Sequence, residues 1–165
     1  MNKNVRNLAI AALLVALAVA GAGFSIPVGI AKCSPVQHLV NVLSAVMLGP
    51  LYAVEVAFTA SLIRVLMGTG TLLAFPGSIC GALLAALIFR RSKKLLPACI
   101  GEVIGTGIIG ALFAYPVAVL LMNKTAAIFG FVIPFAVSSA GGAVIAYVLL
   151  RSMKAFLKEK GIFND

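Results

Sequence analysis

Three polar residues lie close together in an otherwise apolar stretch of the chain. On a helix His38 and Asn41 are three residues apart and Gln37 and Asn41 are four apart, so all three share one face. Lipid offers such groups no hydrogen-bond partner, and they must therefore bond inside the protein or line a wet cavity. The pattern indicates either a binding site for a small ligand or a structural set of helix caps and interhelical hydrogen bonds.

Aromatic and hydroxyl side chains elsewhere could complete such a site. Thr71 and Phe75 lie in a segment rich in glycine and threonine, Tyr115 precedes a proline, and Ser138 lies in a late apolar segment. With His38 and Asn41 these residues could enclose a small, flat, mostly apolar molecule through stacking and a few hydrogen bonds. Filling of the core by the aromatic rings is the open alternative.

Motifs for catalysis and for ATP binding are absent from the sequence. The run Gly77-Ser78-Ile79-Cys80-Gly81 is not a G-x-S-x-G elbow, and no glycine-rich stretch continues into Gly-Lys-Ser/Thr. Cys33, Cys80 and Cys99 have no His at metal-ligand spacing and are predicted to be apolar fillers. We therefore predict no enzyme, no catalytic residue, no metal and no cofactor, so that any ATP energy must enter through other subunits.

Charge predicts how the chain is arranged in a membrane. Hydrophobic residues make up 62% of the sequence and charged residues 10%, and the mean hydropathy is +1.16. Basic residues flanking membrane spans stay on the cytoplasmic side, so clusters on one side require an even number of crossings between them. Ten of the thirteen Lys and Arg residues form three such clusters: Lys3 and Arg6; Arg90, Arg91, Lys93 and Lys94; Arg151, Lys154, Lys158 and Lys160. Both termini are therefore predicted to be cytoplasmic.

The apolar segments between the clusters predict an all-α membrane protein of six spans in one domain, residues 1–165. Gly49-Pro50 breaks the segment 37–67, which is either two short spans or a re-entrant hairpin; we choose two spans. The first segment, ended by Pro27 and Gly29, is interpreted as an uncleaved span and not as a signal peptide, because more spans follow. The expected spans are 8–24, 37–48, 51–67, 76–89, 95–122 and 126–150. Lys32 and Thr71 then belong to two outer loops.

Three charged residues fall inside the expected spans. Glu55 and Glu102 lie toward cytoplasmic ends, where each needs a partner, water or a proton, since an ionised side chain at mid-bilayer costs about 2.5–3.5 kcal/mol. Two carboxylates at different depths do not make a proton relay. Arg64, near an outer end, is expected to extend its charge to the membrane surface.

Small residues form a stripe on the first span. Ala12, Ala16 and Ala20 recur every four residues and make a flat helical face that another helix can approach closely. The stripe could pack inside this protein or contact another subunit, and the spacing does not distinguish the two. Anionic lipid headgroups are the expected partner of the basic clusters, and nucleic acid is not, because no aromatic residues are interleaved with the charges.

The six-span plan, the alanine stripe, Leu48-Gly49-Pro50 and the missing ATP motif resemble the S components, the membrane-embedded substrate-binding subunits of energy-coupling factor (ECF) vitamin transporters. Four stretches resemble the ThiW-type subunits assigned to a thiazole precursor of thiamine: residues 27–33, 37–43, 68–77 and 101–107. This resemblance covers nearly the whole chain.

The resemblance implies a bacterial or archaeal plasma-membrane complex with a transmembrane coupling protein, contacted by the alanine face, and two cytosolic ATPases that use ATP. It implies an outward-facing pocket for hydroxyethylthiazole, and a subunit that topples in the membrane to release its ligand inside. Lys32 could close the loop over this pocket or attract a phosphorylated ligand. The substrate-binding residues expected from the resemblance are Gln37, His38, Asn41, Thr71, Phe75, Tyr115, Glu102, Ser138 and Lys32.

Other functions remain open at this point. The chain could be an S component for another vitamin or precursor. It could also be a self-sufficient channel or proton-coupled carrier that uses Glu55 or Glu102. An intramembrane enzyme ranks last because the catalytic motifs are missing.

Overall fold

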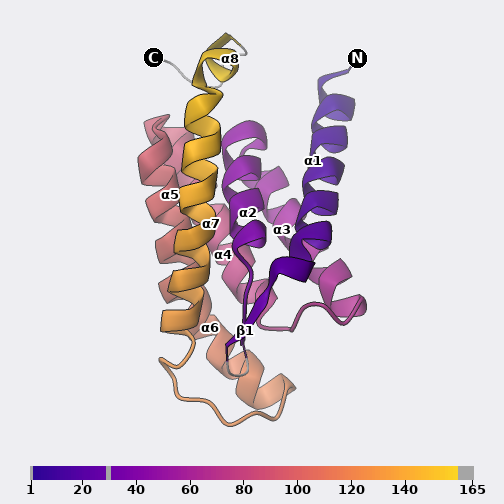
Figure 1. Cartoon of the computed structure of the whole chain (residues 1–165), viewed down its shortest axis with the longest axis vertical. Helices are drawn as coiled ribbons and strands as arrows, with labels where there is room; N and C mark the ends of the chain where they lie inside the picture. Colours follow the sequence, from indigo (N-terminus) through magenta and orange to yellow (C-terminus); the bar gives the residue numbers. More distant parts are fainter. Residues whose placement is uncertain (1, 29–30, 160–165) are drawn as a thin grey trace.

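The structure, a computed structural model, describes residues 2–28 and 31–159, and most of these are helical (Figure 1). Gly29, expected to help end the first helix, and Lys160 of the last basic cluster lie outside the described residues. The elements are α1 (Lys3–Ala20) with a 3-10 turn (Gly21–Phe24), β1 (Ile26–Val28), β2 (Ala31–Cys33), α2 (Pro35–Leu48), α3 (Pro50–Leu66), α4 (Ala74–Ser92), α5 (Leu95–Ile104), α6 (Ala111–Pro116), α7 (Val132–Ser152) and α8 (Lys154–Glu159).

The break between α2 and α3 lies where the sequence predicts it. Gly49 has φ +86°, a backbone conformation that glycine adopts without a steric penalty. Pro50 follows as the first residue of α3, a position where its missing N–H costs no helical hydrogen bond. The predicted break at Gly49-Pro50 is confirmed.

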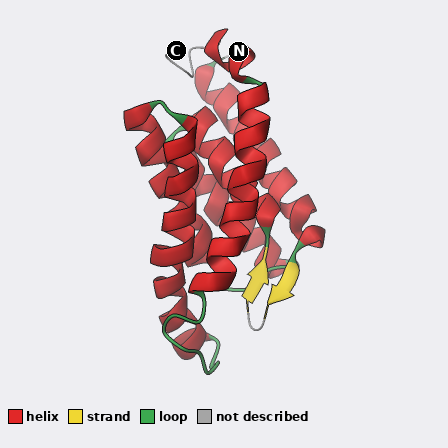
Figure 2. Ribbon diagram, turned by 60° about the vertical axis from the view of Figure 1, so that its left-hand side comes forward, coloured by secondary structure: helices red, strands yellow, loops and turns green. Residues whose placement is uncertain are grey.

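A small β-hairpin joins α1 to α2, so the fold is not entirely α-helical (Figure 2). β1 and β2 are antiparallel, with Ile26 opposite Cys33 and Pro27 opposite Lys32. β1 is exposed, whereas Ala31 and Cys33 of β2 are buried against the bundle. Pro27 is tolerated because it lies in an edge strand, which needs few backbone donors. The stretch expected to be a loop is thus partly ordered as strands.

The helix expected at 95–122 is continuous from Leu95 to Leu121 but is not uniform. Two wider π-helical segments interrupt it, at Gly105–Gly110 and at Val117–Leu121. The second begins directly after Pro116, which has no N–H to donate to the helical ladder. α5, the two π segments and α6 therefore form one long irregular helix.

The last long helix begins at Val132 and not at 126, so that expected boundary is wrong by six residues. Pro134 explains the difference, because proline fits the first turn of a helix and the residues before it fall outside. Phe131 is buried just before the helix, with its ring centroid 5.9 Å from that of Phe135.

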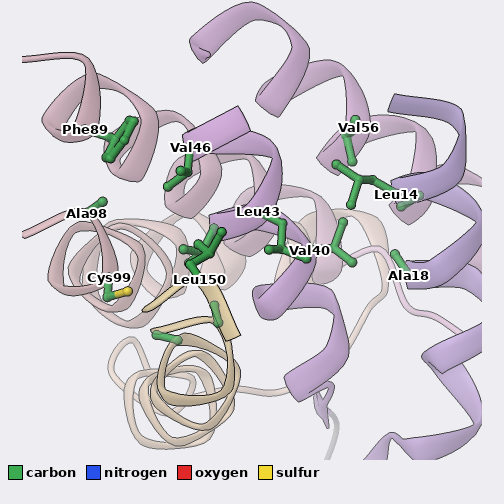
Figure 3. Close-up of a cluster of buried hydrophobic side chains, with 14 of the residues drawn as sticks. Leu14, Ala18, Val40, Leu43, Val46, Val56, Phe89, Ala98, Cys99 and Leu150 are labelled. Carbon is green, nitrogen blue, oxygen red and sulfur yellow. The ribbon is translucent and has the colours of Figure 1, made fainter. Parts of the chain in front are cut away.

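α2 is the central helix of the bundle and contacts α1, α3, α4, α5 and α7. Its burial is nearly complete, which is why polar residues on this helix must find partners inside the protein. The largest apolar cluster surrounds it (Figure 3), with Leu14 and Ala18 from α1, Val40 and Leu43 from α2, and Leu150 from α7. This core holds α2 in place from both sides.

The outside of the bundle is also apolar, as a lipid-facing surface requires; Leu13 and Ile133, for example, are more than two-thirds exposed. In the described part of the chain, four helices are long and apolar enough to cross a membrane: Lys3–Phe24, Ala74–Ser92, Leu95–Leu121 and Val132–Ser152. α2 has 14 residues and α3 has 17, so the count of six full spans stays a prediction.

The two ends of the bundle differ in charge. α1 begins and α8 lies at the same end (Figure 1), and a groove there is lined by Lys93, Lys94, Arg151 and Lys154 among others. At the other end, the Nζ atom of Lys32 donates a hydrogen bond of 2.9 Å to the carbonyl oxygen of Thr69 and joins the hairpin to the connection between α3 and α4. The basic clusters thus gather at one end, and orientation across the membrane stays a prediction.

Candidate functional site

A pocket lies inside the bundle at the end that carries the hairpin. Its free space is only about 30 Å³, room for one or two water molecules, so a larger ligand requires side chains to move. The lining joins the hairpin, α2, the end of α3, α4, the long helix and α7. The lining residues are Lys32, Ser34, Gln37, His38, Arg64, Gly70, Thr71, Leu73, Ala74, Gly77, Ser78, Thr106, Phe135 and Ser138.

A carboxylate lies directly behind this pocket. Glu102 is fully buried, and its Oε1 atom is 2.8 Å from Nδ1 of His38. The same oxygen accepts hydrogen bonds from Nδ2 of Asn41 at 2.9 Å and from Oγ1 of Thr106 at 3.1 Å. Its second oxygen, Oε2, has no hydrogen-bond partner among the described residues. Helices α2 and α5, far apart in the sequence, are thereby joined by polar contacts.

A guanidinium group lies on the opposite side of the same network. The Nη1 atom of Arg64 donates to Oε1 of Gln37 at 2.9 Å, and Nη2 donates to the hydroxyls of Ser34 at 2.7 Å and Ser25 at 3.2 Å. Nε2 of Gln37 then donates to Oδ1 of Asn41 at 3.4 Å. Two side-chain amides therefore connect the arginine with the carboxylate of Glu102.

The prediction that Arg64 extends to the membrane surface is wrong, because only 2% of its surface is exposed. The connection after α3 folds back over it: the backbone N–H groups of Thr69 and Gly70 both donate to the carbonyl oxygen of Arg64. A Cβ at Gly70 would lie 3.1 Å from the arginine Cβ, which shows how closely the connection covers this residue. The side chain is therefore directed into the protein.

The missing side chain at Gly81 leaves room for the carboxylate where α4 packs closely against the long helix. A Cβ added at Gly81 would overlap Oγ1 of Thr106 and would lie 2.7 Å from both carboxylate oxygens of Glu102. Oγ1 of Thr106 also lies 3.1 Å from the carbonyl oxygen of Gly77, one turn earlier on α4. The missing side chain at Gly81 is thus a condition for burying Glu102 here.

Most of the residues expected to bind substrate come together. Lys32, Gln37, His38, Thr71 and Ser138 line the pocket. Asn41 and Glu102 lie behind it in the hydrogen-bonded network. Their convergence required α2, the hairpin and α7 to meet. For example, the backbone N–H of Ser34 donates a hydrogen bond of 2.7 Å to Oγ of Ser138 on α7.

Phe75 and Tyr115 do not line the pocket. α4 turns Ala74, Gly77 and Ser78 inward, and this helical phase directs Phe75 toward α3, where its ring centroid is 5.4 Å from that of Phe58. On α6 the buried residues are Ala111 and Ala114, so Tyr115 lies beside the buried face and is half-buried.

The aromatic ring that does line the pocket is Phe135 of α7. Sequence reasoning missed it, together with Arg64 and Thr106. Thr106 follows Glu102 by one helical turn, and this i, i+4 spacing was the available signal. Phe135 had no such signal, because it is one of ten phenylalanines in an apolar chain.

The alanine stripe lies on the exposed face of α1. Ala12, Ala16 and Ala20 are all exposed, whereas Ala11 and Ala18 on the other side of α1 are buried against the bundle. The interpretation of the stripe as an internal packing face is therefore wrong. A flat surface suited to close approach by another helix remains open on α1.

Comparison with known proteins agrees with a transporter fold. The family model described as "Thiamine-precursor transporter protein (ThiW)" matches residues 8–156. A solved structure, described as "Structure and mechanism of the S component of a bacterial ECF transporter", is similar with a TM-score of 0.79 and 19% sequence identity, over 94% of this chain and 99% of that chain. No curated protein matches the sequence.

Proposed function

The chain belongs to the family of thiamine-precursor transporter proteins (ThiW), multi-pass membrane proteins and not enzymes, and from this premise we propose that it is a substrate-binding subunit that captures a thiamine precursor in the pocket described above. The proposed ligand is hydroxyethylthiazole. The proposed location is a bacterial or archaeal plasma membrane, with the pocket facing outward.

The observation that carries this proposal is the convergence of polar side chains on one buried pocket in an otherwise apolar bundle. His38, Thr71 and Ser138 come from three separate elements and offer hydrogen bonds to the ring nitrogen and hydroxyl of the ligand. Phe135 and Leu73 offer apolar surface to its flat ring. The basic clusters lie at the opposite end of the bundle, and the positive-inside rule then supports an outer location for the pocket.

Transport then depends on other subunits. We propose that the exposed alanines Ala12, Ala16 and Ala20 contact a transmembrane coupling protein, which joins this chain to two cytosolic ATPases of an ECF module. ATP is used by those partners, and this chain needs no cofactor. The fold similarity to an ECF S component and the absence of an ATP motif in the sequence support this division of work.

Ligand binding can be tested on the purified full-length chain. Mass spectrometry should identify a thiazole compound that copurifies. Added hydroxyethylthiazole should raise the melting temperature by mass action. At a ligand concentration a hundred times Kd, the free energy of unfolding should rise by about 2.7 kcal/mol. Phe135→Ala should abolish this shift. The matched variant Phe75→Ala should retain it, because Phe75 does not line the pocket. If another vitamin copurifies, and thiazole compounds leave the melting temperature unchanged, the chain is an S component for that vitamin.

A self-sufficient proton-coupled carrier is the second candidate. The buried contact between His38 and Glu102 is the observation in its favour, since such a pair can hold a proton inside a membrane. Glu55 does not contribute to it, because that side chain is exposed on α3. Uptake into liposomes that contain only this chain and a proton gradient would establish the carrier. Uptake that requires the ATPase subunits would exclude it.

A further inference from the structure

The charges in the pocket specify its ligand further than the family does. We infer that the pocket binds an anion, such as the phosphate monoester of a small heteroaromatic alcohol, and that Arg64 and Lys32 hold the anionic group. This inference rests on the proposed function for the ring-binding part of the site. The anion-binding part stands on the geometry of the two cations.

Arg64 is a buried cation that has no counter-charge in the described part of the chain. Three of its five N–H groups donate hydrogen bonds, and all three acceptors are neutral oxygens, on Gln37, Ser34 and Ser25. Its Nε atom is buried and has no partner, and no carboxylate of the described residues lies within 4.0 Å of the guanidinium. Removing a guanidinium from water without an opposite charge is costly, whereas an anion that binds at the free N–H groups would offset the cost.

Glu102 does not take this role. Its Oε1 atom is already shared by His38, Asn41 and Thr106, and two side-chain amides separate it from the arginine. Two cationic side chains, those of Lys32 and Arg64, thus share the site with one carboxylate, that of Glu102. A bound anion would add a negative charge beside the two cations.

Lys32 supplies the second cation. It is half-buried and lines the same pocket, and its Nζ atom donates to a backbone carbonyl, that of Thr69, which leaves two N–H groups of the ammonium for a ligand. Thr71, which carries a hydroxyl, also lines this pocket. A phosphate group has three terminal oxygens, and one guanidinium N–H, an ammonium and a hydroxyl together match their number and charge.

The test compares three probes on the full-length protein: hydroxyethylthiazole, its phosphate monoester and inorganic phosphate. The chain has no tryptophan, so binding is measured by calorimetry and by melting temperature in nanodiscs of zwitterionic lipid. We expect the ester to bind at least about tenfold more tightly than the alcohol, as charge-assisted hydrogen bonds would give. Lys32→Met and Arg64→Lys should each reduce this preference, and the control Lys124→Met, an exposed cation outside the pocket, should preserve it.

Each outcome decides between the two proposals. Equal or weaker binding of the ester, with the alcohol bound, overturns the anion site and leaves the proposed function in place. If neither thiazole compound binds, but inorganic phosphate stabilises the wild type and not Lys32→Met, the anion site stands and the proposed ligand is wrong. If no probe binds, both proposals fail. If nanodiscs of anionic lipid abolish the preference for the ester, the anion is a lipid headgroup and the inference about the substrate is overturned. Should Arg64→Lys fail to fold, Lys32→Met alone decides the matter.

Discussion

Arg64 and Glu102 are the charged residues on which the polar interior of this protein depends. Each is almost completely buried, and each has one polar atom without a partner among the described residues, Nε and Oε2. Burying charge in an apolar bundle is tolerated only where hydrogen bonds replace water. The amides of Gln37 and Asn41 provide that replacement and keep the two charged groups in fixed positions.

At the same scale, Gly81 decides whether Glu102 can be buried. Alanine in place of glycine usually stabilises a helix by about 1 kcal/mol, but a methyl group at this position would overlap Thr106 and the carboxylate. We expect Gly81→Ala to lower the free energy of unfolding by about 1–3 kcal/mol and to abolish ligand binding. Thermal unfolding in detergent and calorimetry measure the two effects.

Gly23→Ala is the matched control, because a Cβ there meets no atom within 4 Å. Its melting temperature should equal that of the wild type or exceed it. Stabilisation of the protein by Gly81→Ala would contradict the close packing of α4 against Thr106 and Glu102.

At the scale of elements, α2 and α1 have opposite roles. α2 is surrounded by five other helices, so its polar residues lie inside the bundle and can contact groups on its neighbours. α1 lies at the edge, with one face packed on the bundle and the other face open. If α2 supplies ligand contacts and α1 supplies a docking face, as we propose, the two functions can change independently.

This independence can be tested with two alanines of α1 that are two residues apart. Ala16→Phe should change the free energy of unfolding by no more than about 0.5 kcal/mol and leave ligand binding intact, because Ala16 is exposed. It should abolish uptake in cells that contain the complete ECF module, because a bulky ring prevents close approach of another helix. Radiolabelled uptake and calorimetry are the measurements.

Ala18→Phe serves as the contrasting variant. Ala18 is 1% exposed, so the larger ring should destabilise the isolated chain by about 1–3 kcal/mol. Normal uptake by Ala16→Phe would exclude a docking role for the alanine face.

For the molecule as a whole, charge separates the two ends. The groove at one end is lined by four basic residues, Lys93, Lys94, Arg151 and Lys154. The opposite end has Lys32 and Arg64 in its pocket, and both cations donate hydrogen bonds to protein oxygens. The positive-inside rule predicts that the first end stays in the cytoplasm, whereas we propose that Lys32 and Arg64 at the other end belong to a binding site.

The orientation predicts which residues an impermeant thiol reagent reaches. In a background with Cys33, Cys80 and Cys99 replaced, Thr125→Cys should be labelled on intact cells, and Ser152→Cys only after the membrane is permeabilised. Both positions are exposed, so accessibility within the protein does not differ. Labelling is read by mass shift on a gel. The reverse pattern would place the pocket on the cytoplasmic side.

Local properties of the chain determined its helices, its breaks and the separation of charge. Gly49-Pro50 ends one helix and begins another through backbone geometry alone, and the basic clusters gather at one end because an even number of helices lies between them. The resemblance to ThiW-type subunits, confirmed by the match over residues 8–156, depended on short strings of residues in the same way.

Which side chains face the pocket was decided only by the tertiary structure. A shift of one residue along α4 separates Ala74, which lines the pocket, from Phe75, which contacts α3. Likewise, Arg64 could extend to the membrane surface or turn inward, and the connection that folds back over it selects the second arrangement. Helical phase and contacts between distant elements are properties of the packed bundle, whereas sequence spacing reports only neighbours on one helix. The unbalanced charge in the pocket therefore became visible only when the neutral partners of Arg64 were known.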